Sequence, residues 1–179
     1  MSVTIHIENF GNLKFELYCK ESPNACKNFL ALSAKNYYTN SKFHRNIKGF
    51  ILQGGDPTGT GKGGASIYGQ YFNDEINEGL KHDRRGILSM ANSGPNKNGS
   101  QFFITYAKQT SLDGKYTIFG KLIDGFDTLE KLEHEAVGKN NRPLNDIKIE
   151  DITIHANPIA DQDFEEQNEQ NEEALAKQE

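Results

Sequence analysis

The chain has 179 residues, a formal net charge of -5 and a mean hydropathy of -0.71, which suit one domain with a sizeable core. No stretch approaches the roughly 20 apolar residues that span a bilayer, and the first residues lack a signal-peptide pattern, so we expect neither a membrane protein nor a secreted one. Residues 158–179 hold eight acidic residues and one lysine, which leaves 19 basic and 17 acidic residues in 1–157. We therefore expect a nearly neutral domain at 1–157 followed by an acidic tail at 158–179, a balance that argues against a basic nucleic-acid-binding protein.

The cysteines and histidines do not form a recognisable metal-binding or disulfide pattern. Cys19 and Cys26 lie seven residues apart, and the five histidines are scattered along the chain. We expect reduced thiols in a nuclear or cytosolic protein that needs no metal and no cofactor. The 17 Gly, 11 Phe and 7 Tyr favour turns and β structure over a helical bundle.

Alternation of apolar and polar residues predicts strands over residues 2–7 and 13–17, joined into a hairpin by a turn at 9–12. Ser22 and Pro23 predict a helix start, with the Ser22 hydroxyl as N-cap, and the helix should end near residue 35. The later predicted elements are two short strands within 43–54, a long loop at 56–69, strands at 87–91, 102–105 and 117–122, a helix at 124–133, and a closing strand at 147–154 with a bulge at 150–151. Short antiparallel strands with only two helices indicate a closed barrel or a sandwich, and no repeat or second domain is visible.

The glycine-rich stretch 59–64 has the spacing of a dinucleotide-binding fingerprint, yet the residues after it lack a helical pattern. Lys62 is followed by glycine rather than by the serine or threonine of a phosphate-binding loop. We therefore predict a mobile rim loop rather than a nucleotide site. His44 has no nucleophile or carboxylate beside it in the sequence, so we interpret it as structural.

Segments 43–56 and 86–104 place polar residues among apolar ones. Arg45 and Gln53 stand among phenylalanines and aliphatic residues within predicted strands. Because burying a guanidinium without a partner is costly, core packing gives no reason for this placement. Either Arg45 pairs with a nearby carboxylate such as Asp56, or it belongs to a functional site.

Both segments are similar to the two signature stretches of the cyclophilins, and the resemblance extends from about Val3 to His155. It implies a closed eight-stranded antiparallel β-barrel capped by two α-helices, with peptidyl-prolyl cis–trans isomerase activity. The shorter stretches 115–117, 142–146 and 151–158 resemble one subgroup of the family, which implies association with the nuclear splicing machinery.

Carried over position by position, the resemblance implies that Arg45 donates hydrogen bonds to the prolyl nitrogen and carbonyl while the X–Pro bond is twisted. Gln53 would hold Arg45 or the substrate carbonyl, and Asn92 would bind the peptide backbone. The implied catalytic residues are Arg45, Phe50, Gln53, Asn92 and Phe103. The implied substrate-binding residues are Ile51, Gly61, Ala91, Gln101, Ser111, Leu112 and Tyr116, of which Ile51 and Leu112 would form the proline pocket with Phe50 and Phe103.

Three positions depart from the commonest cyclophilin pattern. Ile51 stands where a methionine is usual, Tyr116 where a histidine lines the proline pocket, and Ser111 where the archetype has a tryptophan. Because a tyrosine ring can also close the pocket, we expect isomerisation to survive. The missing indole removes a donor and much contact area, so we expect weak cyclosporin binding.

Three functions compete at this stage. The first is an active isomerase of exposed X–Pro segments; the second is a proline-peptide docking module of a ribonucleoprotein with little turnover. A small-molecule carrier barrel is disfavoured because nothing specifies an open apolar lumen. We expect a monomer with no direct nucleic-acid or membrane partner. The tail is interpreted as a solvated appendage, with a partner-binding or pocket-shading segment as the alternative.

Overall fold

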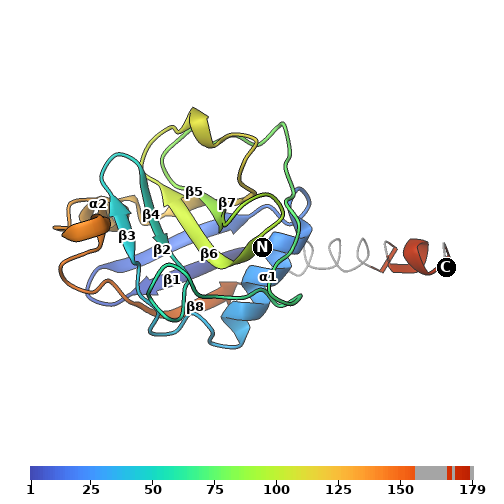
Figure 1. Ribbon diagram of the computed structural model, residues 1–179, viewed down its shortest axis with the longest axis horizontal. Coiled ribbons are helices and arrows are strands. Elements are labelled where there is room, and N and C mark those ends of the chain that lie inside the picture. The colour runs from blue at the N-terminus through green and yellow to red at the C-terminus, as the bar shows by residue number, and fades with distance from the viewer. Residues whose placement is uncertain (156–168, 171, 178–179) are drawn as a thin grey trace.

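The computed structural model describes residues 1–155, 169–170 and 172–177, and within them one antiparallel sheet curls around the core (Figure 1). The strands run in the order β3-β4-β6-β5-β7-β2-β1-β8. Their bounds are β1 Ser2–Ile7, β2 Gly11–Leu17, β3 Arg45–Ile47, β4 Ile51–Gly54, β5 Ile87–Asn92, β6 Asn98–Thr105, β7 Ile118–Asp124 and β8 Ile149–His155. The helices are α1 (Pro23–Ala34), α2 (Phe126–Glu133) and two short 3-10 helices, η1 (Thr110–Leu112) and η2 (Lys139–Asn141). None of the helices in the described ranges is long and apolar enough to cross a membrane.

The sheet is open, so the prediction of a closed barrel is wrong. Strands β3 and β8 form its two edges and do not pair with each other. The edges approach near the start of these strands, at the isolated bridge between Lys42 and Lys148 and at the hydrogen bond from Phe43 N to Ile147 O, 2.9 Å. Ile149, the first residue of β8, also accepts from the N–H of Asn40 at 2.7 Å and donates to the carbonyl of Ser41 at 2.9 Å. Since β3 has only three residues and then turns away, it offers too short an edge to complete the ladder.

The predicted hairpin and bulge are both confirmed. Strands β1 and β2 pair antiparallel around the turn at residues 8–10. Between β1 and β8 the register shifts, because His6 faces Asp151 while Ile7 faces Ile149. Glu150 is therefore the extra residue of a β-bulge, at the position where the apolar pattern slips.

The first helix begins where predicted, but its N-terminus is capped differently. The Ser22 hydroxyl makes no cap and instead donates to the carbonyl of Ile118 at 2.6 Å. The carboxylate of Glu75 accepts hydrogen bonds from the backbone N–H groups of Asn24 and Ala25, at 3.1 and 2.7 Å. A carboxylate from a distant loop thus satisfies the free N–H groups of the first turn and complements the helix dipole.

The core lies between the inner face of the sheet and α1. Phe29 of α1 packs edge-on against Phe102 of β6, with ring centroids 5.4 Å apart, and Tyr38 contacts both rings. Beyond residue 155, residues 169–170 and 172–176 are helical, and Leu175 is 65% exposed. The predicted end of the domain near residue 157 lies outside the described residues.

Candidate active site

Strand register brings three predicted site residues into one row on the outer face of the sheet. Arg45 of β3 faces Gln53 of β4, and Gln53 faces Phe103 of β6. Residues two apart on a strand share a face, so Ile51 and Gln101 lie on this outer face as well. Alternate residues point inward, and the site is therefore built on the side of the sheet opposite the core.

A hydrogen-bond chain links the polar members of this row. Nη1 of Arg45 donates to Oε1 of Gln53 at 3.4 Å, and Nε2 of Gln53 donates to Oε1 of Gln101 at 3.1 Å. Nε2 of Gln101 then donates to the carbonyls of Gly61 and Gly63, both at 3.0 Å. Arg45 itself is exposed, so its guanidinium is available to a ligand while its orientation is supported from behind.

The alternative in which Arg45 pairs with Asp56 is wrong. The Asp56 carboxylate accepts instead from its own loop, including the N–H groups of Gly61 at 2.7 Å and Gly63 at 3.0 Å. Burial by itself would raise the pKa of Asp56, but hydrogen bonds from Thr58, Gly63 and Gly61 lower it to about 2. The loop lies at the rim as predicted, with its backbone anchored by this anion.

The loop also forms one wall of a pocket of about 340 Å³ next to the hydrogen-bond chain. The pocket brings together five predicted site residues: Gln53, Gly61, Ala91, Asn92 and Gln101. The Asn92 side chain donates to the carbonyl of Lys115 at 3.1 Å and accepts from the N–H of Gly94 at 3.2 Å. These bonds tie the end of β5 to the loop before β7 and hold that wall in place.

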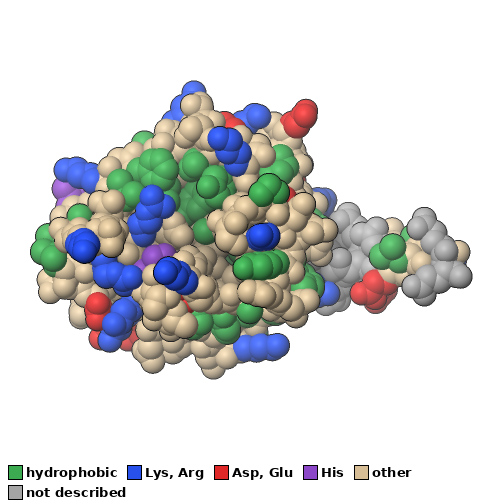
Figure 2. All heavy atoms as spheres, viewed as in Figure 1, with side chains coloured by type: hydrophobic (Ala, Val, Ile, Leu, Met, Phe, Trp, Pro, Cys, Tyr) green, Lys and Arg blue, Asp and Glu red, His purple; other side chains and the backbone are tan. Residues whose placement is uncertain are grey.

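An apolar surface lies on the other side of Gln53. Ile51 and Phe103 are 3% and 2% exposed, so each presents little more than an edge to solvent. The Tyr116 ring meets Phe103 edge-on, with centroids 5.4 Å apart and planes at 87°. Figure 2 shows hydrophobic side chains gathered over the ends of β4 and β6, with lysine and arginine side chains around them.

The predicted residues Phe50, Ser111 and Leu112 lie in two neighbouring turns at this end of the sheet. Nε2 of Gln109 donates to the carbonyl of Gly49 at 2.9 Å, which ties the turn before η1 to the turn that carries Phe50. Phe50 and Leu112 are half-buried, and Ser111 is exposed. None of the three lines the polar pocket.

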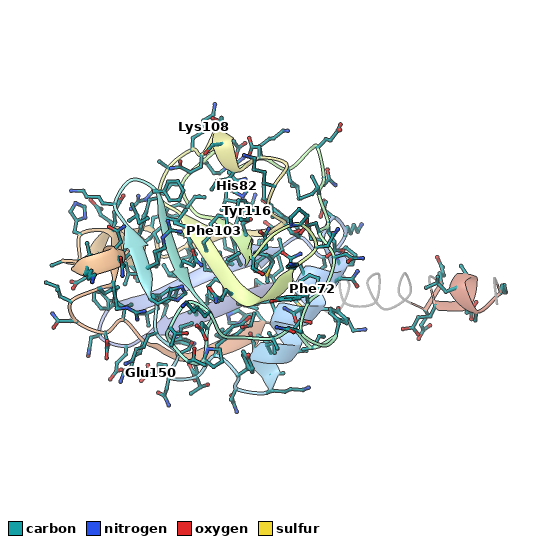
Figure 3. All side chains as sticks on the ribbon, viewed as in Figure 1. Phe72, His82, Phe103, Lys108, Tyr116 and Glu150 are labelled. Atoms are coloured by element: carbon teal, nitrogen blue, oxygen red, sulfur yellow. The ribbon has the colours of Figure 1, made fainter. Side chains whose placement is uncertain are left out.

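His82 and Asp113 support the apolar surface, and reasoning from the sequence missed both. The fully buried His82 ring stacks on Phe103, with centroids 5.8 Å apart and planes at 19° (Figure 3). Its Nδ1 lies 3.0 Å from Oδ1 of Asp113, and its Nε2 lies 3.0 Å from the hydroxyl of Ser89. An ionised carboxylate only accepts, so a neutral His82 carries its proton on Nδ1. The one proton of the Ser89 hydroxyl then has two nearby acceptors, Nε2 of His82 at 3.0 Å and the carbonyl of Thr117 at 3.1 Å.

The electrostatics agree with a neutral ring. Burial lowers the pKa of His82, and Asp113 offsets only part of that effect. Burial would raise the pKa of Asp113, but hydrogen bonds from the His82 backbone and ring hold it below its ordinary value. No local pattern marks His82, since it precedes β5 in a loop and meets Asp113 from 31 residues away.

Within the described residues, no three His, Cys, Asp or Glu side chains come together in a way that could hold a metal ion. The proposed site combines an exposed, supported guanidinium with side-chain amides and an apolar aromatic surface. Such a combination can bind an extended peptide and stabilise charge that develops on one of its atoms.

This fold and site define a cyclophilin-type prolyl isomerase. Residues 2–154 match the family described as "Cyclophilin type peptidyl-prolyl cis-trans isomerase/CLD", and the chain belongs to that family. It is 62% identical over 161 residues to the human protein "Peptidyl-prolyl cis-trans isomerase-like 3", covering 89% of this chain and 99% of the relative. It is 61% identical over 160 residues to "Peptidyl-prolyl cis-trans isomerase CYP18-1" of Arabidopsis thaliana, with the same two coverages. The subgroup expected from the sequence is the isomerase-like 3 type, and these relatives confirm it.

A solved structure gives the same result. The crystal structure of a cyclophilin type peptidyl-prolyl cis-trans isomerase from Cryptosporidium parvum superposes with a TM-score of 0.85 at 64% identity, covering 88% of this chain and 98% of that one. A second structure of the Cryptosporidium protein, in the presence of the dipeptide Ala-Pro, has a TM-score of 0.85 at 63% identity. The protein is accordingly a peptidyl-prolyl cis–trans isomerase.

Proposed function

We propose that the protein binds X–Pro segments across the outer face of β3, β4 and β6 and that Arg45 stabilises the twisted peptide bond. Rotation about an X–Pro bond must cross a barrier of about 18–20 kcal/mol because the planar amide is conjugated. In the twisted state the prolyl nitrogen regains a lone pair, so a donor aimed at it binds the transition state more strongly than either planar isomer.

The observation that carries this proposal is the chain from Arg45 through Gln53 to Gln101, beside the Phe103 surface. Arginine keeps its charge and presents several N–H groups in a fixed plane, which suits contact with both the prolyl nitrogen and a neighbouring carbonyl. The Phe103 surface would hold the proline ring and exclude water, which strengthens the guanidinium contact. The Cryptosporidium relative studied with Ala-Pro supports the choice of ligand.

Roles for the other residues follow from where they lie. Tyr116 packs against Phe103, and we assign Ile51, Phe50 and Leu112 to the same apolar surface, which would take the proline ring, with the exposed Ser111 at its border. Asn92, Ala91, Gln101 and Gly61 line the adjoining pocket, which would take the flanking peptide.

NMR exchange spectroscopy on an Ala-Pro peptide tests this assignment. We expect Arg45→Ala to lower kcat/KM by about 10²- to 10³-fold, the typical cost of removing one transition-state donor. Lys131→Ala, on an exposed part of α2, serves as the control and should leave the rate unchanged. Retained exchange in Arg45→Ala would refute the role given to Arg45.

A docking module with little turnover is the second candidate, favoured by the unusual Ser111 and Tyr116. Peptide binding without exchange enhancement in the unmodified protein would support it over the catalytic proposal.

The cellular setting is also a proposal. Similarity to one subgroup in the stretches 115–117 and 142–146 supports a nuclear or cytoplasmic protein that acts within the splicing machinery. Co-purification with spliceosomal proteins from nuclear extract tests this, and loss of the association in Arg45→Ala would show that the X–Pro site mediates it.

We also propose that residues 1–157 form the isomerase domain and 158–179 an appendage. Deleting 158–179 should leave the melting temperature and kcat/KM unchanged. A clear rise in kcat/KM after deletion would instead indicate that the tail covers the substrate pocket and limits access to it.

A further inference from the structure

Asp56 is a fully buried carboxylate that is held by its own loop. Its Oδ1 accepts from the backbone N–H and the hydroxyl of Thr58, at 2.8 and 2.7 Å. Its Oδ2 accepts from the hydroxyl of Thr60 at 3.3 Å and from the N–H groups of Gly61 and Gly63. No Lys or Arg in the described part of the chain forms an ion pair with it.

A buried charge of this kind is tolerated only when hydrogen bonds replace its hydration. The five donors of residues 58–63 supply that replacement, so the ionised carboxylate and the loop conformation stabilise each other. Gly63 packs so closely that a Cβ atom there would overlap Asp56 and Thr58. The loop backbone is therefore built around this one anion.

The same two glycines connect Asp56 to the row of site residues. Gly61 and Gly63 donate their N–H groups to Asp56 and accept Nε2 of Gln101 at their carbonyls, both at 3.0 Å. Because the Gln101 N–H₂ group is used by these carbonyls, its Oε1 faces Gln53. Gln53 must then present Nε2 to Gln101 and Oε1 to Arg45. The hydrogen bonds therefore all run in one direction: Arg45 donates to Gln53, Gln53 donates to Gln101, and Gln101 donates to the two glycine carbonyls.

We propose that Asp56 is a positioning residue for isomerisation: by anchoring the rim loop it orients Gln101 and Gln53, and through them the guanidinium of Arg45. The inference rests on the proposed role of Arg45. It assigns a function to a buried carboxylate that touches no substrate.

Asp56→Asn tests the proposal. The amide keeps the shape of the side chain but turns an N–H₂ group toward donors of the loop, so the glycine carbonyls no longer hold Gln101 in place. A displacement of about 1 Å can cost a catalytic group up to about 10²-fold in rate. We expect kcat in Asp56→Asn to fall about tenfold, with KM for an Ala-Pro peptide changed less than threefold.

Glu75→Gln is the matched control, because Glu75 is likewise a carboxylate that accepts two backbone N–H bonds, but at the start of α1. Both variants should lower the melting temperature, whereas only Asp56→Asn should lower kcat. The Nε–Hε resonance of Arg45 gives a second readout: in Asp56→Asn it should shift and lose order, and in Glu75→Gln it should stay as in the unmodified protein.

Three results separate the outcomes. Loss of kcat in both Arg45→Ala and Asp56→Asn, with a changed Arg45 resonance, supports the inference. Loss in Arg45→Ala but kcat within twofold in folded Asp56→Asn overturns the inference and leaves the proposed function intact. No loss in Arg45→Ala refutes the proposed function itself, and the inference with it.

Discussion

Nη1 of Arg45 lies 3.4 Å from Oε1 of Gln53, and the two residues face each other directly in the β3–β4 register. This distance is at the long end of a hydrogen bond, so the contact guides the guanidinium without immobilising it. Strand β3 is a sheet edge of only three residues, so the Arg45 backbone has a strand neighbour on one side alone. The hydrogen bonds that run from Gln53 to Gln101 and on to the loop glycines therefore help to orient the guanidinium of Arg45.

Substitutions of Gln53 should reveal both halves of its role. Gln53→Leu removes the contacts with Arg45 and Gln101, and we expect kcat/KM to fall about tenfold. Gln53→Glu keeps an acceptor for Arg45 but turns a carboxylate toward Oε1 of Gln101, so its kcat/KM should lie between the Leu variant and the unmodified protein. Exchange spectroscopy on an Ala-Pro peptide measures both, and equal activity of the two variants would count against the Gln101 link.

Tyr116 should act through its ring rather than through its hydroxyl. An edge-on aromatic pair such as Tyr116 with Phe103 is worth about 0.5–1.5 kcal/mol beyond the area it buries. We expect Tyr116→Ala to raise KM for an Ala-Pro peptide about three- to tenfold and Tyr116→Phe to leave KM unchanged. A comparable loss in Tyr116→Phe would assign the effect to the hydroxyl.

His82 should make stability fall on mild acidification. Burial lowers the pKa of His82 below the ordinary value of 6.5. Just below pH 6.5 the imidazole is therefore protonated in the unfolded chain but still neutral in the folded protein, and this difference lowers the free energy of unfolding. The contribution of neutral His82 is complete above pH 6.5 and is lost as the pH falls toward and through its lowered pKa in the native state.

Urea unfolding at pH 8, 7, 6 and 5 measures this effect. The free energy of unfolding of His82→Gln should be lower at pH 8 but depend less steeply on pH. His44→Gln is the comparison, because burial also lowers the pKa of His44, whose ring lies next to Gly61. An unchanged pH slope in His82→Gln would show that the ring is not the titrating group.

Ser111 should limit cyclosporin binding. It is exposed on η1, where the archetype of the family has a tryptophan, so an indole can be added there without displacing core residues. We expect weak binding by calorimetry, with a dissociation constant above the submicromolar range. Ser111→Trp should tighten it about tenfold or more, and submicromolar binding by the unmodified protein would contradict this explanation.

Local patterns predicted most of the secondary structure. The alternation in β1 and β2 and the proline at the start of α1 are properties of neighbouring residues, and they were confirmed. The slip at Glu150 correctly predicted a bulge for the same reason. The N-cap was wrong because the Ser22 hydroxyl has a competing acceptor on Ile118, 96 residues away.

The signature segments also held the residue types of the site, including Arg45 and Gln53, and they led directly to the family. They did not predict which side chains contact each other when the residues lie far apart in the sequence. The link from Gln53 to Gln101 spans 48 residues and depends on the β4–β6 register. Contacts of this kind follow from how strands and loops pack together, and periodicity carries no information about them.

Composition and short motifs were thus enough for the mainly β class and the family, and they named the residues of the proposed site. The open sheet edge, the carboxylate that caps α1 and the support of Phe103 by His82 came from tertiary packing. Asp56 shows the difference best. Its position at the end of the first signature segment left an ion pair with Arg45 as one alternative. In the folded protein its buried carboxylate instead accepts hydrogen bonds from the N–H groups of Gly61 and Gly63 in its own loop.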